Sequence, residues 1–524
     1  MKSEALDTSL KKIAKGTGIV LTGTILGMLL GLVSRIVIVR YVTPSEFGLL
    51  YLSLTITGIT ATIACLGFPV ATVRYVAFYL ETKDTAKVRE VIKTSLVVSS
   101  IISITLFLFI FFFAHRLASL FNEPQLVPVI KIMSFIIPAR ALVSVLVSIL
   151  RGFEDVKSKI YFHDIFPYIT KLPLLGIVVL LGFAFRGVVY ASLISFLAVA
   201  MLAGIYSLKK VVPHIKGRQA RSSSSEKALL RRELVFFALP LFVTIILQLI
   251  ISSTDTLMLG YFRSARVVGF YNVAHPIANY IAVILGASAF IYFPIATALH
   301  AQNLTSELKQ MYQITTKWVF TLTLPLFLLA FLVPDSTLYF LFGTQYLQAA
   351  TALRILSLGF FLHTFLGLNI QTLIVFGKAR YVMLNNLMVA GLNVILNLQL
   401  IPRFGLEGAA FASAVSLILG NILASVELYK ISGIHPFTRN YFKPIALSIP
   451  LAIICYFMGN FIKSIHLQVI LLGLSFTAVS LLSIIITRSV EREDLMILRS
   501  TQQKLGINLP LAESALKKII GKQK

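Results

Sequence analysis

The chain has 524 residues, of which 57% are hydrophobic and 13% are charged, and its mean hydropathy is +0.88. This composition excludes a soluble globular domain, in which about a quarter of the residues carry charge. The net charge of +26 is concentrated in short connections between apolar runs, which is typical of membrane topology and argues against a nucleic-acid partner.

The apolar runs predict an all-α polytopic membrane protein, because about 20 apolar residues in a helix span the bilayer core. We expect about fourteen transmembrane helices, and the segment 70–82 is a candidate extension of the second. The runs occupy residues 17–40, 47–68, 94–114, 126–150, 160–182, 187–208, 234–260, 267–297, 316–333, 347–376, 381–401, 405–429, 443–462 and 466–487.

The sequence indicates an internal duplication. At an offset of 221 residues, 187–195 aligns with 408–416, and the Gly, Ala and two Ser residues coincide. Near the start of each half, an offset of 220 matches Tyr41 to Tyr261, and one inserted residue brings Gly48 to Gly269. An even number of helices per repeat gives both halves the same orientation, and substrate sites of transporters tend to lie between such repeats.

The repeat predicts two pseudo-symmetric six-helix lobes with two extra C-terminal helices. Lys and Arg favour the cytoplasmic side; because most of them lie at the ends of the chain and in the even-numbered connections, we place both termini in the cytoplasm. The predicted parts are an N-lobe (1–208), a basic cytoplasmic linker (209–232), a C-lobe (233–430), helices thirteen and fourteen (431–487) and a cytoplasmic amphipathic tail (488–524).

Six basic residues lie inside the apolar runs. They are Arg35, Lys131, Arg140, Lys171, Lys317 and Arg354. A charge at the centre of a bilayer costs about 2.5–3.5 kcal/mol on insertion scales, so such residues tend to face a cavity or a partner. Lys131, Lys317 and Arg354 lie near helix ends, where a long side chain can reach the interface. We predict that Arg35, Arg140, Lys171, Arg354 and Lys131 bind an anionic substrate.

Only two acids, Asp164 and Asp255, lie at comparable depth. In the repeat, Asp255 falls opposite Arg35. Two alternatives stay open: the two residues form an ion pair that closes the lobes, or Arg35 binds substrate while Asp255 couples a proton or Na⁺. Asp164 is a second candidate for ion coupling or lobe pairing, and its spacing of seven residues places it on the same helix face as Lys171.

A stripe of small residues on the first helix predicts close helix packing. Gly23, Gly27 and Gly31 repeat every four residues, which lets another backbone approach. Amides on the tenth and eleventh helices have two candidate roles, contact with the polar part of a substrate and hydrogen bonds between helices, and the second is expected for most of them. They are Asn369, Gln371, Asn385, Asn386, Asn393 and Asn397.

Two segments carry a family resemblance. Residues 40–49 (RYVTPSEFGL) resemble the R-x-L-G-P-x-E-[FY]-G-L signature of the polysaccharide/oligosaccharide (O-antigen-type) flippase family, with Val42-Thr43 in place of the usual Leu-Gly. Residues 66–77 (LGFPVATVRYVA) resemble the segment that ends the second helix of that family. The family belongs to the multidrug/oligosaccharidyl-lipid/polysaccharide exporter superfamily, which also holds lipid II flippases and MATE (multidrug and toxin extrusion) exporters.

The resemblance implies a flippase of the cytoplasmic (plasma) membrane that translocates a polyprenyl-(pyro)phosphate-linked oligosaccharide by alternating access, with membrane lipid and glycan-assembly proteins as further partners. It implies no enzymatic activity. We expect no cofactor and no metal, because Cys65 and Cys455 lie apart in helices without a histidine cluster. The rivals are a MATE-like exporter, expected to have a carboxylate-rich cavity, and a polytopic glycan polymerase or ligase, expected to have a large outer domain.

Overall fold

The computed structural model describes residues 2–155, 157–215 and 224–489. The centre of the predicted linker (216–223) and almost all of the predicted tail (490–524) lie outside the described residues. Contacts divide the chain into two compact units. We call Thr22–Gly269 the N-unit and the remainder the C-unit, and each is described by itself.

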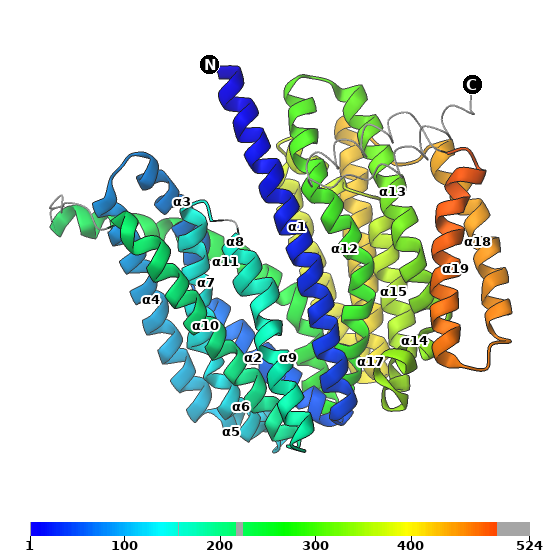
Figure 1. The fold of residues 1–524 in the computed structure, drawn as a ribbon, viewed down its shortest axis with the longest axis horizontal. Helices are drawn as coiled ribbons and strands as arrows, with labels where there is room; N and C mark the ends of the chain where they lie inside the picture. The colour runs from blue at the N-terminus through cyan, green and yellow to red at the C-terminus, as the bar shows by residue number, and fades with distance from the viewer. Residues whose placement is uncertain (1, 156, 216–223, 490–524) are drawn as a thin grey trace. The chain divides into compact units, whose positions relative to one another are not determined.

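The N-unit is a bundle of helices that begins in the second half of α1 (Figure 1). Its helices are α1 (Lys2–Tyr41), α2 (Pro44–Ala64), α3 (Phe68–Glu81), α4 (Thr85–Phe112), α5 (Ala114–Leu120), α6 (Leu126–Ser134), α7 (Ile136–Gly152), α8 (Lys157–Lys159), η1 (Ile160–Ile165), α9 (Phe166–Leu180), α10 (Phe185–Ile215) and α11 (Ser224–Phe262).

The C-unit is helical as well, and α18 and α19 pack as a pair beside α13 (Figure 1). These are the two helices expected beyond the repeat. The helices after α11 are α12 (Ala265–Ala301), α13 (Thr305–Leu332), α14 (Pro334–Phe342), η2 (Thr344–Ala349), α15 (Ala350–Phe365), α16 (Asn369–Val375), α17 (Ala379–Ser432), α18 (Arg439–Gly459) and α19 (Ile465–Ile486).

Thirteen helical segments of the described chain are long and apolar enough to cross a membrane. One of them, α17, has 54 residues, which is more than twice the length of one crossing. Its backbone leaves helical geometry at Gly405, where φ is 58°, and a Cβ at Gly408 would lie 2.4 Å from the carbonyl oxygen of Leu400. The chain therefore reverses there, which yields the two helices predicted at 381–401 and 405–429.

Hydrogen bonds confirm the antiparallel pairing within α17. The Asn385 amide donates to the Glu427 carboxylate at 2.7 Å, and the Asn393 amide donates to the Ser413 hydroxyl at 3.4 Å. Residues later in the first half of α17 pair with residues earlier in its second half, as in a hairpin. The predicted use of amides between helices is confirmed at these positions, and also at Asn369, which donates to the Ser425 hydroxyl at 2.7 Å.

The family-like segment at residues 40–49 builds the start of α2. The Thr43 hydroxyl accepts from the Glu46 backbone N–H at 3.3 Å, and the Glu46 carboxylate accepts from the Thr43 backbone N–H at 2.9 Å. This is a capping box, with Pro44 at the first helical position. Phe47 is fully buried. The threonine that replaces the usual glycine thus adds a side-chain cap.

Residues at matched positions of the repeat contact each other where α2 meets the start of α12. A Cβ on Gly48 would lie 1.6 Å from the carbonyl oxygen of Ala265, and a Cβ on Gly269 would lie 2.1 Å from that of Pro44. Pro44 and Ala265 are related by the same offset of 221 residues as the two glycines. Such reciprocal contacts are expected of residues beside a twofold pseudo-symmetry axis, and they support the duplication.

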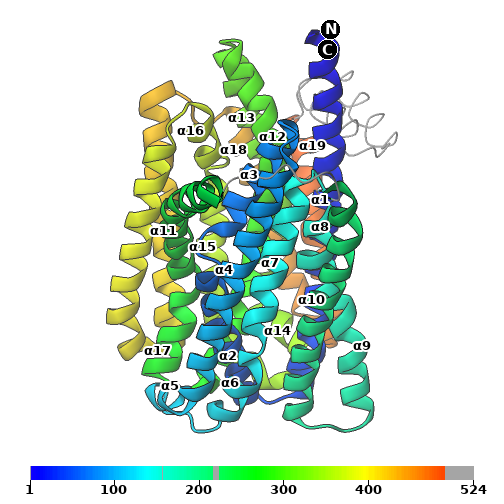
Figure 2. The ribbon, with the colours of Figure 1, turned by 90° about the vertical axis from the view of Figure 1, so that its left-hand side faces the viewer.

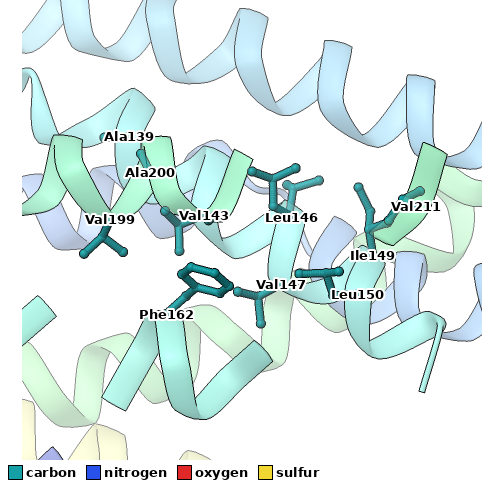
Figure 3. Close-up of a cluster of buried hydrophobic side chains, with 12 residues drawn as sticks. Ala139, Val143, Leu146, Val147, Ile149, Leu150, Phe162, Val199, Ala200 and Val211 are labelled. Atoms are coloured by element: carbon teal, nitrogen blue, oxygen red, sulfur yellow. The ribbon is translucent and has the colours of Figure 1, made fainter. Parts of the chain in front are cut away.

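Helix α7 is the central helix of the N-unit, packed against α3, α4 and α10 (Figure 2). A cluster of buried apolar side chains joins it to α10 and η1. Figure 3 shows Phe162 of η1 with its ring beside Val143 and Val147 of α7. This cluster fixes the positions of α7, α10 and η1 relative to one another, and these three elements also carry polar side chains.

The second family-like segment docks α11 onto the N-unit. Gly67 has a φ of 77°, and a Cβ there would lie 2.4 Å from the carbonyl oxygen of Ala238. The Tyr75 hydroxyl donates to the Glu233 carboxylate at 2.9 Å. Arg231 of α11 donates through Nε and Nη2 to Oε1 of Glu90, each at 2.6 Å. The first turns of α11 are therefore held by polar contacts.

The Glu90–Arg231 pair predicts an asymmetric response to mutation. Glu90 is 7% exposed, whereas the Arg231 side chain is 52% exposed. We expect Arg231→Met to lower the free energy of unfolding by about 1–2 kcal/mol, since it leaves a buried carboxylate unpaired. Glu90→Gln should cost less than about 1 kcal/mol, because Arg231 stays hydrated. Thermal unfolding of the purified protein measures both; equal losses would contradict the assignment.

Candidate functional site

The glycine stripe of α1 packs against η1 and the start of α9, the helix that carries Lys171. Cβ atoms at Gly23, Gly27 and Gly31 would meet Ile160, Asp164 and Tyr168 respectively, at 2.2–3.0 Å. The predicted close backbone approach is therefore confirmed, and its partner is the η1–α9 segment.

A cavity of about 400 Å³ lies inside the N-unit, between α2, α7, η1, α9 and α10, with one contribution each from α3 and α11. Its polar lining comes from charged, aromatic and hydroxyl side chains, and none of the described lining residues is acidic. The lining residues that carry a polar group are Thr62, Cys65, Arg140, Ser144, His163, Tyr168 and Lys171.

Two of the predicted cations share this cavity and one aromatic ring. The guanidinium carbon of Arg140 and the ammonium nitrogen of Lys171 each lie over the Phe196 ring, 5.5 Å from its centre. Arg35 lies over the Tyr51 ring at 5.1 Å. Of the predicted cations, Arg140 and Lys171 therefore share one ring.

The Phe196 ring lowers the energetic cost of holding two positive charges near each other. Both charges lie 5.5 Å from one ring centre, so they are separated by at most about 11 Å, twice that distance. At an effective dielectric constant of about 20, two like charges repel by about 1.5 kcal/mol at that largest separation, and by more at a shorter one. A cation–π contact contributes about 0.5–2 kcal/mol. Two such contacts counter part of the repulsion without neutralising either charge, so the cavity stays positive.

The two predicted acids lie apart from the cavity lining. The Asp164 carboxylate accepts from the Thr24 hydroxyl of α1 at 3.0 Å, and Asp164 is not among the described residues that line the cavity with Lys171. The π-helical turn η1 precedes α9 and has more residues per turn than an α-helix, which rotates Asp164 relative to Lys171. Asp255 is buried on α11, 5% exposed.

The remaining predicted residues lie elsewhere. Lys131 of α6 lies over the Phe111 ring at 5.7 Å. Arg354 of α15, in the C-unit, is exposed and donates to the carbonyl oxygen of Phe331 at 3.0 Å. Lys317 is buried and donates to the carbonyl oxygen of Ser489 at 2.8 Å. The structure thus brings Arg140 and Lys171 together at the Phe196 ring, whereas Arg35 and Lys131 each contact a different ring.

Sequence reasoning missed the neutral side chains of the cavity. His163 and Pro167 precede Lys171 by eight and four residues and line the same cavity. Their spacing in steps of four residues would have pointed to them once Lys171 was chosen as the reference. Phe196 gives none, because it is one of many aromatic residues in an apolar helix. Within the described ranges, no three His, Cys, Asp or Glu side chains gather as a metal site requires.

Comparisons with known proteins agree with the sequence motifs. The model of the family described as "Polysaccharide biosynthesis protein" matches residues 13–300, and that of MatE matches residues 240–398. An uncharacterised membrane protein of Methanocaldococcus jannaschii is 25% identical over 56% of this chain. The probable flippase AglR of Haloferax volcanii is 30% identical over 34% of it. These matches span 58% and 37% of the relatives' own lengths.

Solved structures show the same fold. Lipid II flippase MurJ in an inward closed conformation has a TM-score of 0.68 at 14% identity, covering 91% of this chain and 99% of MurJ. An inward-facing multidrug resistance MATE transporter has a TM-score of 0.60 at 17% identity, covering 79% of this chain and 98% of that one. The chain is a multi-pass membrane protein that belongs to the polysaccharide biosynthesis protein family.

Proposed function

We propose that the chain is a flippase that moves a polyprenyl-(pyro)phosphate-linked oligosaccharide from the cytoplasmic to the outer leaflet. The observation that carries this proposal is the cavity lined by Arg140 and Lys171, with no acid among its described lining residues. A guanidinium binds phosphate oxygens through paired hydrogen bonds, and an ammonium adds a compact point charge. The apolar polyprenyl chain needs no cavity, because it can remain in the bilayer.

The cavity supports an anionic headgroup over an organic cation. A cation entering it would meet two fixed positive charges, whereas a phosphate replaces its hydration shell with charge-assisted hydrogen bonds. The relatives also support a flippase, since AglR is a probable flippase and MurJ is a flippase of lipid II. Alternating access, coupling to H⁺, Na⁺ or the membrane potential, and cytoplasmic placement of both termini are parts of this proposal.

Reconstitution tests the proposal directly. Purified protein in liposomes is expected to move defined polyprenyl-linked glycans between leaflets, faster than protein-free liposomes do. A matched assay offers organic cations instead. Cation accumulation without glycan translocation would replace the flippase by a MATE-like exporter, and polymerised or transferred glycan would indicate the enzyme class.

The cationic cavity predicts a selective loss of transport. Arg35→Ala, Arg140→Ala and Lys171→Ala should each lower the translocation rate about 10- to 100-fold, because a hydrogen bond to a charged group contributes about 1.5–3 kcal/mol. Membrane insertion should be unchanged. Arg116→Ala is the control, since Arg116 is an exposed cation of α5. Wild-type rates in all three variants would exclude an anion site here.

The matched pair Arg35 and Asp255 is tested by a charge swap. If the two residues pair, Arg35→Asp and Asp255→Arg should each lower transport and the double variant should recover it, since the attraction is restored with reversed sign. If they act separately, the losses should multiply. The measurement is the translocation rate at equal protein density.

Ion coupling is tested by removing the charge of each acid. If Asp255 or Asp164 couples a proton or Na⁺, the corresponding Asn variant should lose the dependence of transport on that ion gradient, because an amide cannot take up the proton or the cation charge. Translocation with and without each gradient measures this. A dependence that both variants retain would leave the membrane potential as the driving force.

A further inference from the structure

Two uncharged residues contact the cations of the cavity. Phe196 of α10 lies 5.5 Å from both charged groups, measured from its ring centre, and it lines the cavity. Gly58 of α2 lies beside the Arg140 side chain: a Cβ there would come within 2.9 Å of Nη1, 3.7 Å of Cζ and 3.9 Å of Nη2. Three of the four heavy atoms of one guanidinium therefore approach the same glycine.

Gly58 occupies the interior of a helix, where glycine is unfavourable. It lies six residues before the end of α2 (Pro44–Ala64), and its carbonyl oxygen accepts from the Thr62 hydroxyl at 2.9 Å. Its φ is helical, so the backbone does not require glycine. Alanine would be favoured there by about 1 kcal/mol of helix propensity. The space that glycine leaves is the space into which the guanidinium fits.

We propose that Gly58 and Phe196 are positioning residues: Gly58 sets the depth of the Arg140 guanidinium, and Phe196 holds Arg140 and Lys171 together so that both face one phosphate-type anion. This inference rests on the proposed function.

Gly58 and Phe196 are expected to favour anion binding because they hold the two cations in place before the anion arrives. Arg and Lys side chains each carry about 2 kcal/mol of rotamer entropy, and two like charges move apart when nothing holds them. A ring face that attracts both cations, and a glycine that admits one of them, keep the pair converged before the anion arrives. The anion then binds without the cost of ordering two flexible, mutually repelling groups.

The glycine test separates binding from folding. Gly58→Ala is expected to keep or raise the thermal unfolding temperature and to weaken binding of inorganic pyrophosphate about five- to tenfold, because the methyl group displaces the guanidinium. Gly204→Ala is the matched control, a helical glycine of α10 with nothing within 4 Å of the added Cβ, and it should leave the affinity unchanged. Calorimetry on the full chain in nanodiscs measures both. Equal affinity in wild type and Gly58→Ala would overturn the role of Gly58.

The aromatic test uses rescue by a conservative variant. Phe196→Leu should weaken pyrophosphate binding about tenfold, and Phe196→Tyr should bind within about threefold of wild type, since it retains the ring face. Phe112→Leu is the control, a 72% exposed ring of α4. Loss of affinity in Phe196→Tyr equal to that in Phe196→Leu would indicate that packing rather than the ring face is responsible.

A measurement without any anion separates this inference from the proposed function. The drop in thermal stability caused by Phe196→Leu should be smaller in a Lys171→Met background than in wild type, because one cation–π partner is already absent. If the two substitutions are coupled in this way but the protein does not bind pyrophosphate, the anion site is rejected and the positioning role of Phe196 is retained. If the protein binds pyrophosphate, Phe196→Leu leaves that binding intact and the substitutions are not coupled, the positioning role is rejected and the anion site is retained.

Discussion

A positive charge held at membrane depth needs a partner, and in this protein aromatic rings and backbone carbonyl oxygens are among those partners. Each of the six basic residues within the apolar runs contacts either an aromatic ring or a backbone carbonyl oxygen. The ring contacts belong to Arg35, Lys131, Arg140 and Lys171, and the carbonyl contacts to Lys317 and Arg354. A carboxylate would cancel the charge, whereas a ring or a carbonyl lowers its cost and leaves its field in place. A cavity built this way remains attractive to an anion.

Irregular turns within the helices determine which groups reach the cavity. The π turn at Ile160–Ile165 brings Ile160 and Asp164 to the contact with α1, and Phe162 and His163 to the cavity. The break at Gly67 lets α11 approach α3, and Ile245 of α11 then adds to the cavity wall. Such turns are tolerated at membrane depth because neighbouring helices cover the backbone. The same local departures from ideal helices that make boundaries hard to predict therefore shape the site.

The sequence allowed the helices and their number to be predicted, because apolar length depends on local composition. It also gave the glycine stripe of α1, since a period of four on a helix is visible without a partner. Phe196 and Asp164 could not be assigned this way: the first depends on the rotation of α10 within the bundle, and the second on a π turn. The two family-like segments proved to be structural, through the capping box at Thr43 and Glu46 and the docking of α11 at Gly67. Pro69 is the one motif residue among the described lining of the cavity, so the recognisable motif and the candidate site are here largely different sets of residues.

The reciprocal contact of Gly48 and Gly269 has a historical consequence. A residue beside a twofold axis of a duplicated chain touches its own copy. In a half-length precursor that paired with itself, one codon would have determined both sides of this contact, and any change would have acted twice. After duplication the two sides became separate codons. Each still needs a glycine, because the opposing atom is a carbonyl oxygen that cannot withdraw without unwinding a helix. Duplication thus freed most of the sequence to diverge between the halves, while this crossing stayed tied to its origin.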